Sequence, residues 1–497
     1  MEKLRGTVEP SEYKHIVLSL IFLKFVCDGS EFRFQEIKKH GHSTGVQTEN
    51  FDSLNRVFCV PENSRWSMLV KQADQQDISF RLDNALHELE NSNPPLKGCL
   101  PVDYFTHLGI NANRLSALIE SVDKITGREE DVFGRIYEYF IDKFAAVSGK
   151  GGGEFYTPKC VVNLLVEMIQ PLNGKVYDPC CGSGGMFVQS AKFIASHSGN
   201  QKAVCSIYGQ ELNSATHKLA RMNLAIHGIA AGLGDASADT LLDDQHPDLR
   251  ADYILANPPF NQKGWRASDE LNDDPRWSKF GIPPGKNANF GWILHIISKL
   301  SNDGTAAFAM ANVSLSSERF GVEKIRQKIV EKDLVDCMVA LPSQLFYTTR
   351  IPICLWLLTK NKKARSLKGH IRENKDRSGQ TLFIDASLMG CMVDRTHRQL
   401  SVDDISRISH TYHNWQRGVG YDDIPGFCKN VQRNDIAAQR YILIPSRYVG
   451  ESEDEEESEP FEGKMQRLAD ELRDQMEKSA ELDSEIKSNL ASLGIEW

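Results

Sequence analysis

The stretch Val176-Tyr-Asp-Pro-Cys-Cys-Gly-Ser-Gly-Gly185 predicts a short strand, a glycine-rich turn and the start of a helix. In an open α/β sheet such a turn lies at the carboxyl end of its strand, where ligands bind. Asp178 stands at the end of the strand, and a carboxylate there accepts a hydrogen bond from an amine but repels a pyrophosphate. We therefore expect a zwitterionic cofactor without phosphate at this turn, rather than a dinucleotide.

Short β-branched or aromatic runs alternate with helix-like segments around this turn. The predicted strands are Lys175–Tyr177, Ala203–Tyr208, Tyr253–Ala256, Ala306–Ala311, Leu334–Leu341, Ile353–Leu358 and Thr381–Ala386. The predicted helices between them are Gly185–Ser196, Ser214–Ile226, Phe290–Leu300 and Glu323–Glu331. This alternation predicts a doubly wound, mostly parallel α/β sheet of the Rossmann-like kind, which we expect to occupy residues 129–450.

The two ends of the chain differ from this central part. Residues 1–128 predict an all-α domain, because Tyr13–Val26 and Asn111–Ile125 carry apolar residues at helical spacing. Residues 451–497 predict an acidic linker followed by one long amphipathic helix or a helical hairpin over Phe461–Leu493. That last helix either contacts a partner or packs on the body of the chain, and both interpretations stay open.

Composition sets further limits on the function. The net charge is −9, but residues 451–459 hold seven acidic residues, so the rest of the chain carries −9 + 7 = −2. Any DNA site is therefore a local patch or belongs to a partner. The 11 cysteines form no paired Cys-x-x-Cys motif, which favours reduced thiols and no metal site. The apolar run Ile16–Val26 is too short and too polar to cross a bilayer, so we expect a cytoplasmic protein without a membrane partner.

A basic segment follows the predicted strand Ile353–Leu358. Residues 360–377 contain eight Lys or Arg in eighteen positions. Two interpretations are open, a contact with DNA phosphates and a solvated loop.

A second carboxylate closes the next predicted strand. Ile207-Tyr-Gly-Gln-Glu211 ends in an acid 29 residues after Gly182. An acid at this place binds both hydroxyls of a ribose in dinucleotide folds, where the spacing is about 20 residues. A surface glutamate at a strand end is the alternative interpretation.

The strand Tyr253-Ile-Leu-Ala ends in Asn257-Pro-Pro-Phe260, and this motif carries the chemistry. The side chain of Asn257 and the carbonyl of Pro258 are placed to accept hydrogen bonds from one –NH₂ group, while Pro258 and Pro259 fix the backbone. Two such acceptors support the positive charge that develops when a base amine attacks a methyl group. Phe260 is placed to stack on a flipped base. A rigid turn with an Asn cap is the alternative.

Taken in order, these motifs resemble a known family. Gly153-Glu-Phe-Tyr-Thr-Pro-Lys159, Asp178–Gly185, Gly209-Gln-Glu211 and Asn257-Pro-Pro-Phe260 resemble the modification subunit of type I restriction-modification enzymes, an adenine-N6 DNA methyltransferase family. The likeness covers residues 9 to 440. It implies a methyltransferase sheet that uses S-adenosylmethionine, and a specificity subunit that selects the DNA sequence.

The resemblance also implies a role for each matching residue. The residues implied in cofactor binding are Glu154, Phe155, Tyr156, Thr157, Pro158, Lys159, Asp178, Ser183, Gly184, Gly185, Glu211 and Asp239. Asp235 competes with Asp239 for the contact to the cofactor adenine. Asn257, Pro258, Pro259 and Phe260 are the implied catalytic residues, and they act by position, without a metal and without a general base.

The implied partners are double-stranded DNA, a specificity subunit, a second copy of this chain and a restriction subunit with nuclease and translocase activity. Three rival hypotheses remain at this point. A methyltransferase for a protein glutamine uses the same chemistry, a self-sufficient enzyme reads its own DNA sequence, and a scaffold keeps the fold without activity.

Overall fold

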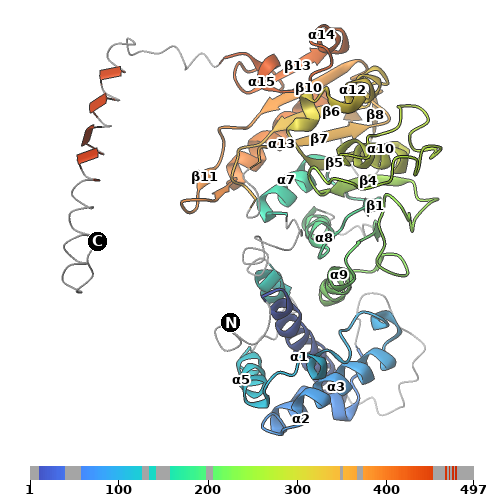
Figure 1. Cartoon of the computed structure of the whole chain (residues 1–497), viewed down its shortest axis with the longest axis vertical. Coiled ribbons are helices and arrows are strands. Elements are labelled where there is room, and N and C mark those ends of the chain that lie inside the picture. The colour runs from blue at the N-terminus through green and yellow to red at the C-terminus, as the bar shows by residue number, and fades with distance from the viewer. Residues whose placement is uncertain are drawn as a thin grey trace.

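The structure is a computed structural model that describes residues 10–39, 58–125, 134–141, 157–197, 205–346, 351–366 and 373–451, together with separate positions between 465 and 479. Figure 1 shows a sheet domain above a group of helices that begins with the amino-terminal helix. The predicted cofactor residues Glu154, Phe155 and Tyr156 lie outside the described residues.

One nine-stranded sheet forms the centre of the larger domain. Its order is β13-β10-β6-β7-β5-β4-β1-β2-β3. The strands are β1 Gly174–Asp178, β2 Cys205–Gly209, β3 Ala231–Gly232, β4 Ala251–Ala256, β5 Leu300–Ala311, β6 Val335–Ala340, β7 Ile353–Thr359, β10 Gln380–Asp385 and β13 Cys428–Gln432. Seven of them run parallel, whereas β7 and β13 run antiparallel to their neighbours. β2 and β3 lie on one side of β1, whereas β4 and β5 lie on its other side, so the strand order reverses between β1 and β4. These two strands form the topological switch point where open α/β sheets bind ligands.

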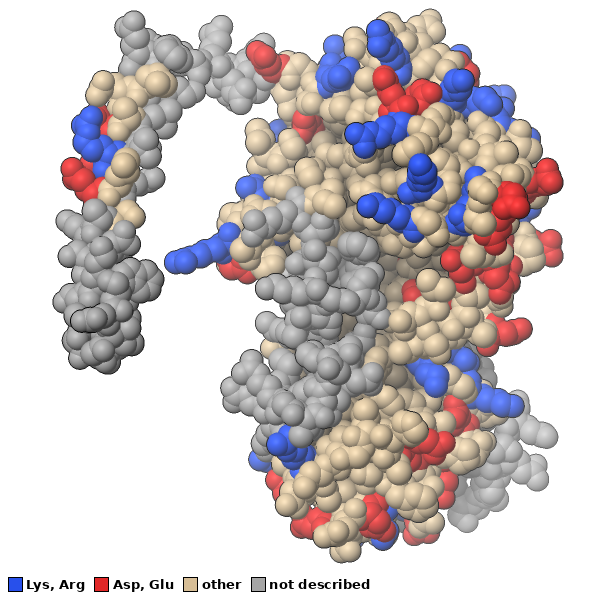
Figure 2. Space-filling view, in the orientation of Figure 1, with Lys and Arg blue, Asp and Glu red and all other residues tan. Residues whose placement is uncertain are grey.

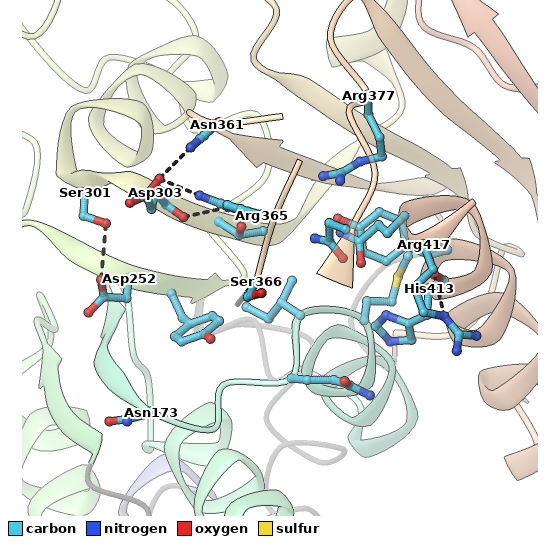
Figure 3. A pocket seen from close by; sticks show the side chains of 18 of the residues that line it. Asn173, Asp252, Ser301, Asp303, Asn361, Arg365, Ser366, Arg377, His413 and Arg417 are labelled. Carbon is cyan, nitrogen blue, oxygen red and sulfur yellow. Dashed lines mark hydrogen bonds and ion pairs between the residues drawn. The ribbon is translucent and has the colours of Figure 1, made fainter. Parts of the chain in front are cut away.

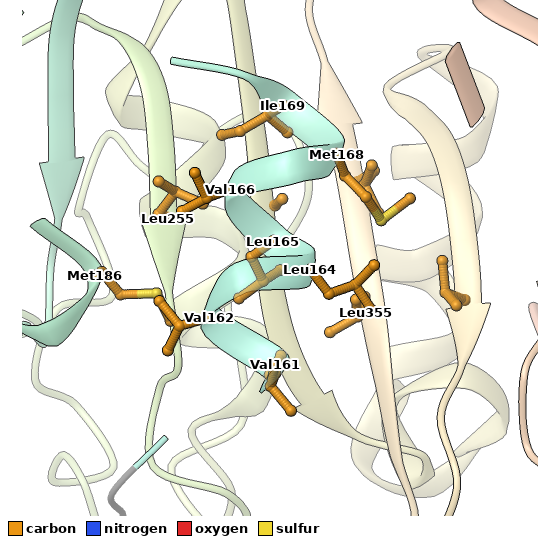
Figure 4. Packing of buried hydrophobic residues seen from close by; sticks show 14 of the residues in the cluster. Val161, Val162, Leu164, Leu165, Val166, Met168, Ile169, Met186, Leu255 and Leu355 are labelled. Carbon is orange, nitrogen blue, oxygen red and sulfur yellow. The ribbon is translucent and has the colours of Figure 1, made fainter. Parts of the chain in front are cut away.

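Helices cover both faces of the sheet. One face carries α7 Lys159–Ile169, α8 Gly185–His197, α9 Ser214–Ile226 and α13 Val402–Arg417, and the other carries α10 Asn289–Lys299, α12 Val322–Glu331, α14 Arg433–Ala438 and α15 Ser446–Val449. Figure 4 shows α7 lying along the sheet, with its aliphatic side chains between Met186 of α8 and Leu355 of β7. Burial on both faces explains why strands such as β7 are apolar at nearly every position.

The amino-terminal helices form a third buried cluster. They are α1 Pro10–Lys39, α2 Trp66–Lys71, α3 Ile78–Ser92, α4 Tyr104–His107 and α5 Ala112–Asp123. The helix at 134–141 adds Tyr137 and Ile141 to this cluster, and α9 of the sheet domain adds Leu219, Met222 and Ile226. The helical group is therefore packed directly on α9.

Short elements complete the described chain. They are η2 Glu62–Ser64, η3 Pro94–Leu96, α11 Val313–Ser316, η4 Arg319–Gly321, β8 Arg365–Ser366, β9 Glu373–Asn374, β11 Cys391–Met392 and β12 Arg398–Gln399. Between 465 and 479 the described positions are helical, and Met465 and Met476 are exposed there. The rest of the helix predicted over Phe461–Leu493 lies outside the described residues. Within the described part of the chain, no helix combines the length and the apolar character that crossing a membrane requires.

The predicted fold class is confirmed, and every predicted strand overlaps a strand of the sheet. Within the sheet domain, the prediction lacked the helices α7, α11, α13, α14 and α15. The antiparallel direction of β7 was also not predicted.

Candidate active site

Three motifs meet at one edge of the sheet. β1 lies between β2 and β4, and its residue Asp178 is in register with Gly209 of β2. Tyr177 of β1 is in register with Ile254 of β4. Because all three strands are parallel, their carboxyl ends share one edge of the sheet. Asp178 is the last residue of β1, Glu211 comes two residues after β2, and Asn257 directly follows β4.

The glycine-rich turn after β1 is tied to the end of β2 through the backbone. Cys181 N donates to the Gln210 carbonyl over 2.9 Å, and Gln210 N donates to the Asp178 carbonyl over 3.1 Å. Gly182 and Gly184 have φ values of 55° and 80°, which favour glycine. A Cβ atom added at Gly182 would meet no atom within 4 Å, so the turn faces open space.

Asp178 lies buried beneath this turn. One carboxylate oxygen accepts a hydrogen bond from Cys180 N over 3.0 Å. Burial nevertheless raises the pKa of Asp178 to about 7, because its desolvation outweighs that hydrogen bond. A cationic ligand beside this buried carboxyl would stabilise its ionised form.

Glu211 closes the site on the side of β2. One of its carboxylate oxygens accepts from Gly182 N over 3.0 Å and the other from Asn213 N over 2.8 Å. The residue therefore faces the glycine turn, as the ribose prediction requires. A side chain at Gly209 would come within 2.9 Å of Phe187 and Leu233, so the strand end has no room for one.

The loop that carries Asp239 is held against the same strand end. Ala238 N donates to the Glu211 carbonyl over 3.0 Å, and the buried side chain of Gln210 donates to the carbonyls of Ala238 and Asp243. Asp239 is half-buried and Asp235 is exposed. The position of Asp239 favours it over Asp235, and its contact with an adenine stays a prediction.

Asn257 is the most unusual residue of the site. Its side chain is 8% exposed, and neither amide atom has a hydrogen-bond partner among the described residues. Buried polar groups without partners are rare, because each carries a desolvation cost that nothing offsets. Here the unpaired carbonyl oxygen lies in the motif that predicts an acceptor for a base amine.

The turn after the motif is clamped from α10. Asn289 accepts from Asn261 N and donates to the Asn261 side chain, each over 2.9 Å. This pairing holds Asn261 at a φ of 56° and so fixes the exit from Phe260. Phe260 itself is buried and lies edge-on against Phe346, with 5.7 Å between ring centroids.

The start of α7 lies near this edge, because α7 leads back to the amino end of β1. Pro158 is buried and accepts the first backbone hydrogen bonds of the helix, and Thr157 is half-buried. The ammonium of Lys159 lies 3.6 Å from Glu138. The Ser183 carbonyl accepts from the Asn223 side chain over 2.8 Å, and Gly185 begins α8. The cofactor roles of these residues stay predictions.

A cavity of about 580 Å³ lies at the opposite edge of the sheet (Figure 3). Asp252 and Tyr253 at the start of β4 line it, together with Arg365 and Arg377. It is separate from the candidate active site.

The basic segment 360–377 borders this cavity, and three of its six described cations form ion pairs. Lys362 contacts Asp333 at 2.8 Å, Arg365 contacts Asp303 at 2.7 Å and Arg377 contacts Asp336 at 3.2 Å. These ion pairs within the chain favour the interpretation without DNA for these three residues, and the contact of the segment with DNA phosphates stays a prediction. Residues 367–372 lie outside the described chain.

Three residues that shape the site were not assigned a role from the sequence. Gln210 belonged to a quoted motif, and its place directly before Glu211 was a usable signal. Asn289 and Phe346 reach the site only through tertiary contacts, and no local pattern marks them.

Comparisons with known proteins place the chain among methylases. The family model of the N-6 DNA methylase matches residues 128–457, and that of the HsdM N-terminal domain matches residues 1–122. The type I restriction enzyme HindI methylase subunit of Haemophilus influenzae is 44% identical over 84% of this chain and 93% of its own length. The MjaIX methylase subunit of Methanocaldococcus jannaschii is 34% identical over 99% of this chain and 90% of its own.

A solved structure agrees with this placement at the level of the fold. The type I methyltransferase subunit of Streptococcus thermophilus has a TM-score of 0.71 and 23% identity, and the likeness covers 90% of this chain and 97% of that one.

Proposed function

Because the chain belongs to the N-6 DNA methylase family, and among its members to the methylase subunits of type I restriction enzymes, we propose that it transfers a methyl group from S-adenosylmethionine to the N6 amine of an adenine in DNA. The observation that supports this most is Asn257 after β4, whose buried amide has no hydrogen-bond partner among the residues that the structure describes. An acceptor that is desolvated before the substrate arrives loses little when it binds an amine.

The residues at the carboxyl edge fit S-adenosylmethionine. The buried Asp178 would bind its ammonium, the open turn at Gly182 would admit its methionine part, and Glu211 would bind its ribose. The cofactor supplies a methyl group already activated by the sulfonium charge. The protein therefore needs to supply position and not a nucleophile.

The target amine is activated by geometry. An adenine rotated out of the duplex would place its N6 against the Asn257 side chain and the Pro258 carbonyl. These two acceptors stabilise the positive charge that develops on the nitrogen during transfer. Phe260 would support the face of the base.

Sequence selection would come from a separate specificity subunit. The relatives are each named a methylase subunit of a restriction enzyme, which supports an assembly of several subunits. A second copy of this chain and a restriction subunit complete the proposed assembly. The chain would then act on adenines that its partner has selected.

The test is transfer of labelled methyl from S-adenosylmethionine to DNA by this chain with its specificity subunit. We expect label on adenine N6, and we expect Asn257→Ala to lower the rate by at least about a hundredfold, because it removes one transition-state acceptor. Asn173→Ala at the opposite edge is the matched control and should leave the rate unchanged.

Cofactor binding to Asn257→Ala is measured in parallel, so that a folding defect is recognised. Label transferred equally by Asn257→Ala and the wild type would contradict the proposal. Label on a protein rather than on DNA would favour the glutamine-methylating alternative.

A further inference from the structure

A small hairpin stands at the same edge of the sheet as Asn257. It follows β10, which runs parallel to β6 and therefore ends at that edge. β11 and β12 pair antiparallel, with Cys391 opposite Gln399 and Met392 opposite Arg398. Figure 1 shows this part of the chain projecting from the body of the domain. Residues 388–399 are called the edge hairpin below.

The edge hairpin is joined to the wall of the target-base site. Arg398 N donates to the Gln344 carbonyl over 2.9 Å. Two residues further along the same loop, Phe346 packs against Phe260. These contacts place the base of the edge hairpin beside the loop that packs on Phe260.

The turn of the edge hairpin is held in one conformation. Asp394 accepts hydrogen bonds from the backbone of Thr396 and His397 over 2.7 and 2.8 Å, and it pairs with the His397 ring at 2.6 Å. At the base, Gly390 has a φ of 83°, and a Cβ there would lie 2.7 Å from the Gln399 carbonyl. The acidic side chain is thus occupied within the turn.

Most of the other side chains of the edge hairpin are exposed, although Met389 packs against the core. Leu388 is 85% exposed, Val393 is 63% exposed and Met392 is 44% exposed. Arg395 is also exposed. Figure 2 shows a basic side chain standing out from the part of the surface where Figure 1 places β11. Aliphatic side chains gathered on one projection indicate a contact surface.

We propose that the edge hairpin enters the DNA beside the flipped adenine, with Met392 and Val393 against the base step that the adenine has left and Arg395 on a neighbouring phosphate. This inference rests on the proposed function. Removing a base from the duplex leaves unstacked neighbours, and aliphatic side chains are known to insert at such steps. An exposed arginine attracts a phosphate.

DNA is favoured over a protein partner by the position of the edge hairpin. The contacts from Arg398 to Gln344 and from Phe346 to Phe260 place it beside the target-base site rather than on an outer face. Its one acid, Asp394, is hydrogen-bonded to the backbone and the ring of His397 within the turn.

The test uses the assembled enzyme and two forms of its target duplex. In one form the target adenine is paired with thymine, and in the other it lies opposite an abasic site. We expect the double variant Met392→Ser, Val393→Ser to methylate the paired duplex at least about tenfold more slowly, because it no longer fills the gap in the stack. We expect near wild-type rates on the abasic duplex, where unpairing is already done.

Arg395→Ala should weaken DNA binding and lower the salt slope of binding by about one. Val419→Ser and Arg440→Ala are the matched controls. Both residues are exposed. Val419 follows the end of α13 at the opposite edge, and Arg440 follows β13 and α14. They should change neither rate nor binding. Cofactor binding by each variant verifies its fold.

Three outcomes separate the possibilities. Equal rates on the paired duplex for the hairpin variant and the Val419 control would overturn the inference while the proposed function stands. Loss of assembly with the specificity subunit would also overturn it, and would make the edge hairpin a protein contact. Absence of DNA methylation by the wild type would instead contradict the proposed function.

Discussion

Two residues at the candidate active site are buried without the partners that burial normally demands. Neither amide atom of Asn257 has a hydrogen-bond partner in the described part of the chain, and the buried carboxyl of Asp178 accepts from one backbone N–H there. Both arrangements lower the stability of the folded chain. The proposed function gives a physical reason for this cost. A base amine would supply the missing contact of Asn257, and a cofactor ammonium would supply that of Asp178.

Asp178 should make the stability of the unliganded chain depend on pH. Its folded pKa of about 7 lies above the value of 3.8 for an unfolded aspartate. Between these values the folded chain keeps a proton that the unfolded chain releases, so the free energy of unfolding falls as pH rises from about 4 to 7. Denaturant unfolding at several pH values should show a slope of up to about 1.4 kcal/mol per pH unit from this group.

Asp178→Asn provides the control for that slope, because its side chain does not titrate. The slope over this range should shrink in the variant, while the contributions of other groups remain. A pH dependence identical in variant and wild type would show that Asp178 keeps its charge when buried.

At the scale of elements, the sequence predicts what repeats along the chain and misses what depends on distant contacts. The strands around Asp178 and Asn257 were predicted because each is a short apolar run that ends in a polar motif. α7 was missed although Lys159, Asn163 and Glu167 recur every four residues and mark one polar face of a helix. α13 was missed although Ser401 and Asp404 form a capping box that the sequence displays. The direction of β7 has no local signal, since only its neighbours in the sheet determine it.

The ion pairs of the basic segment predict how much each cation contributes to the stability of the fold. Arg377 and Arg365 line the same cavity, but Arg377 is buried against Asp336, whereas Arg365 contacts the exposed Asp303. Burial alone would raise the pKa of Asp336, yet Arg377 and Lys362 hold it below the usual range. Arg377→Ala should therefore lower the free energy of unfolding by about 3–5 kcal/mol, because it removes the ion-pair partner of a buried carboxylate.

Arg365→Ala is the matched comparison and should cost about 1 kcal/mol or less, since water and salt screen its pair. Urea unfolding of both variants measures the difference. Equal losses of stability would mean that the buried carboxylate finds another partner or takes up a proton.

At the scale of the whole molecule, α9 joins the two domains. Ala220 and Leu224 pack in the sheet domain, while Leu219, Met222 and Ile226 belong to the core of the amino-terminal helices. α9 also begins three residues after Glu211, with Asn213 as its cap. The helix that starts at the proposed ribose site is thus the one on which the helical domain rests.

This arrangement predicts that the two domains unfold together as long as α9 is intact. Met222→Asp places a charge in the shared cluster and should separate unfolding into two steps, with the helical domain lost at the lower urea concentration. Met222→Leu keeps an apolar side chain of similar size and should retain a single step. Far-ultraviolet circular dichroism follows both transitions. Coincident single transitions in Met222→Asp would mean that contacts other than this face of α9 hold the domains together.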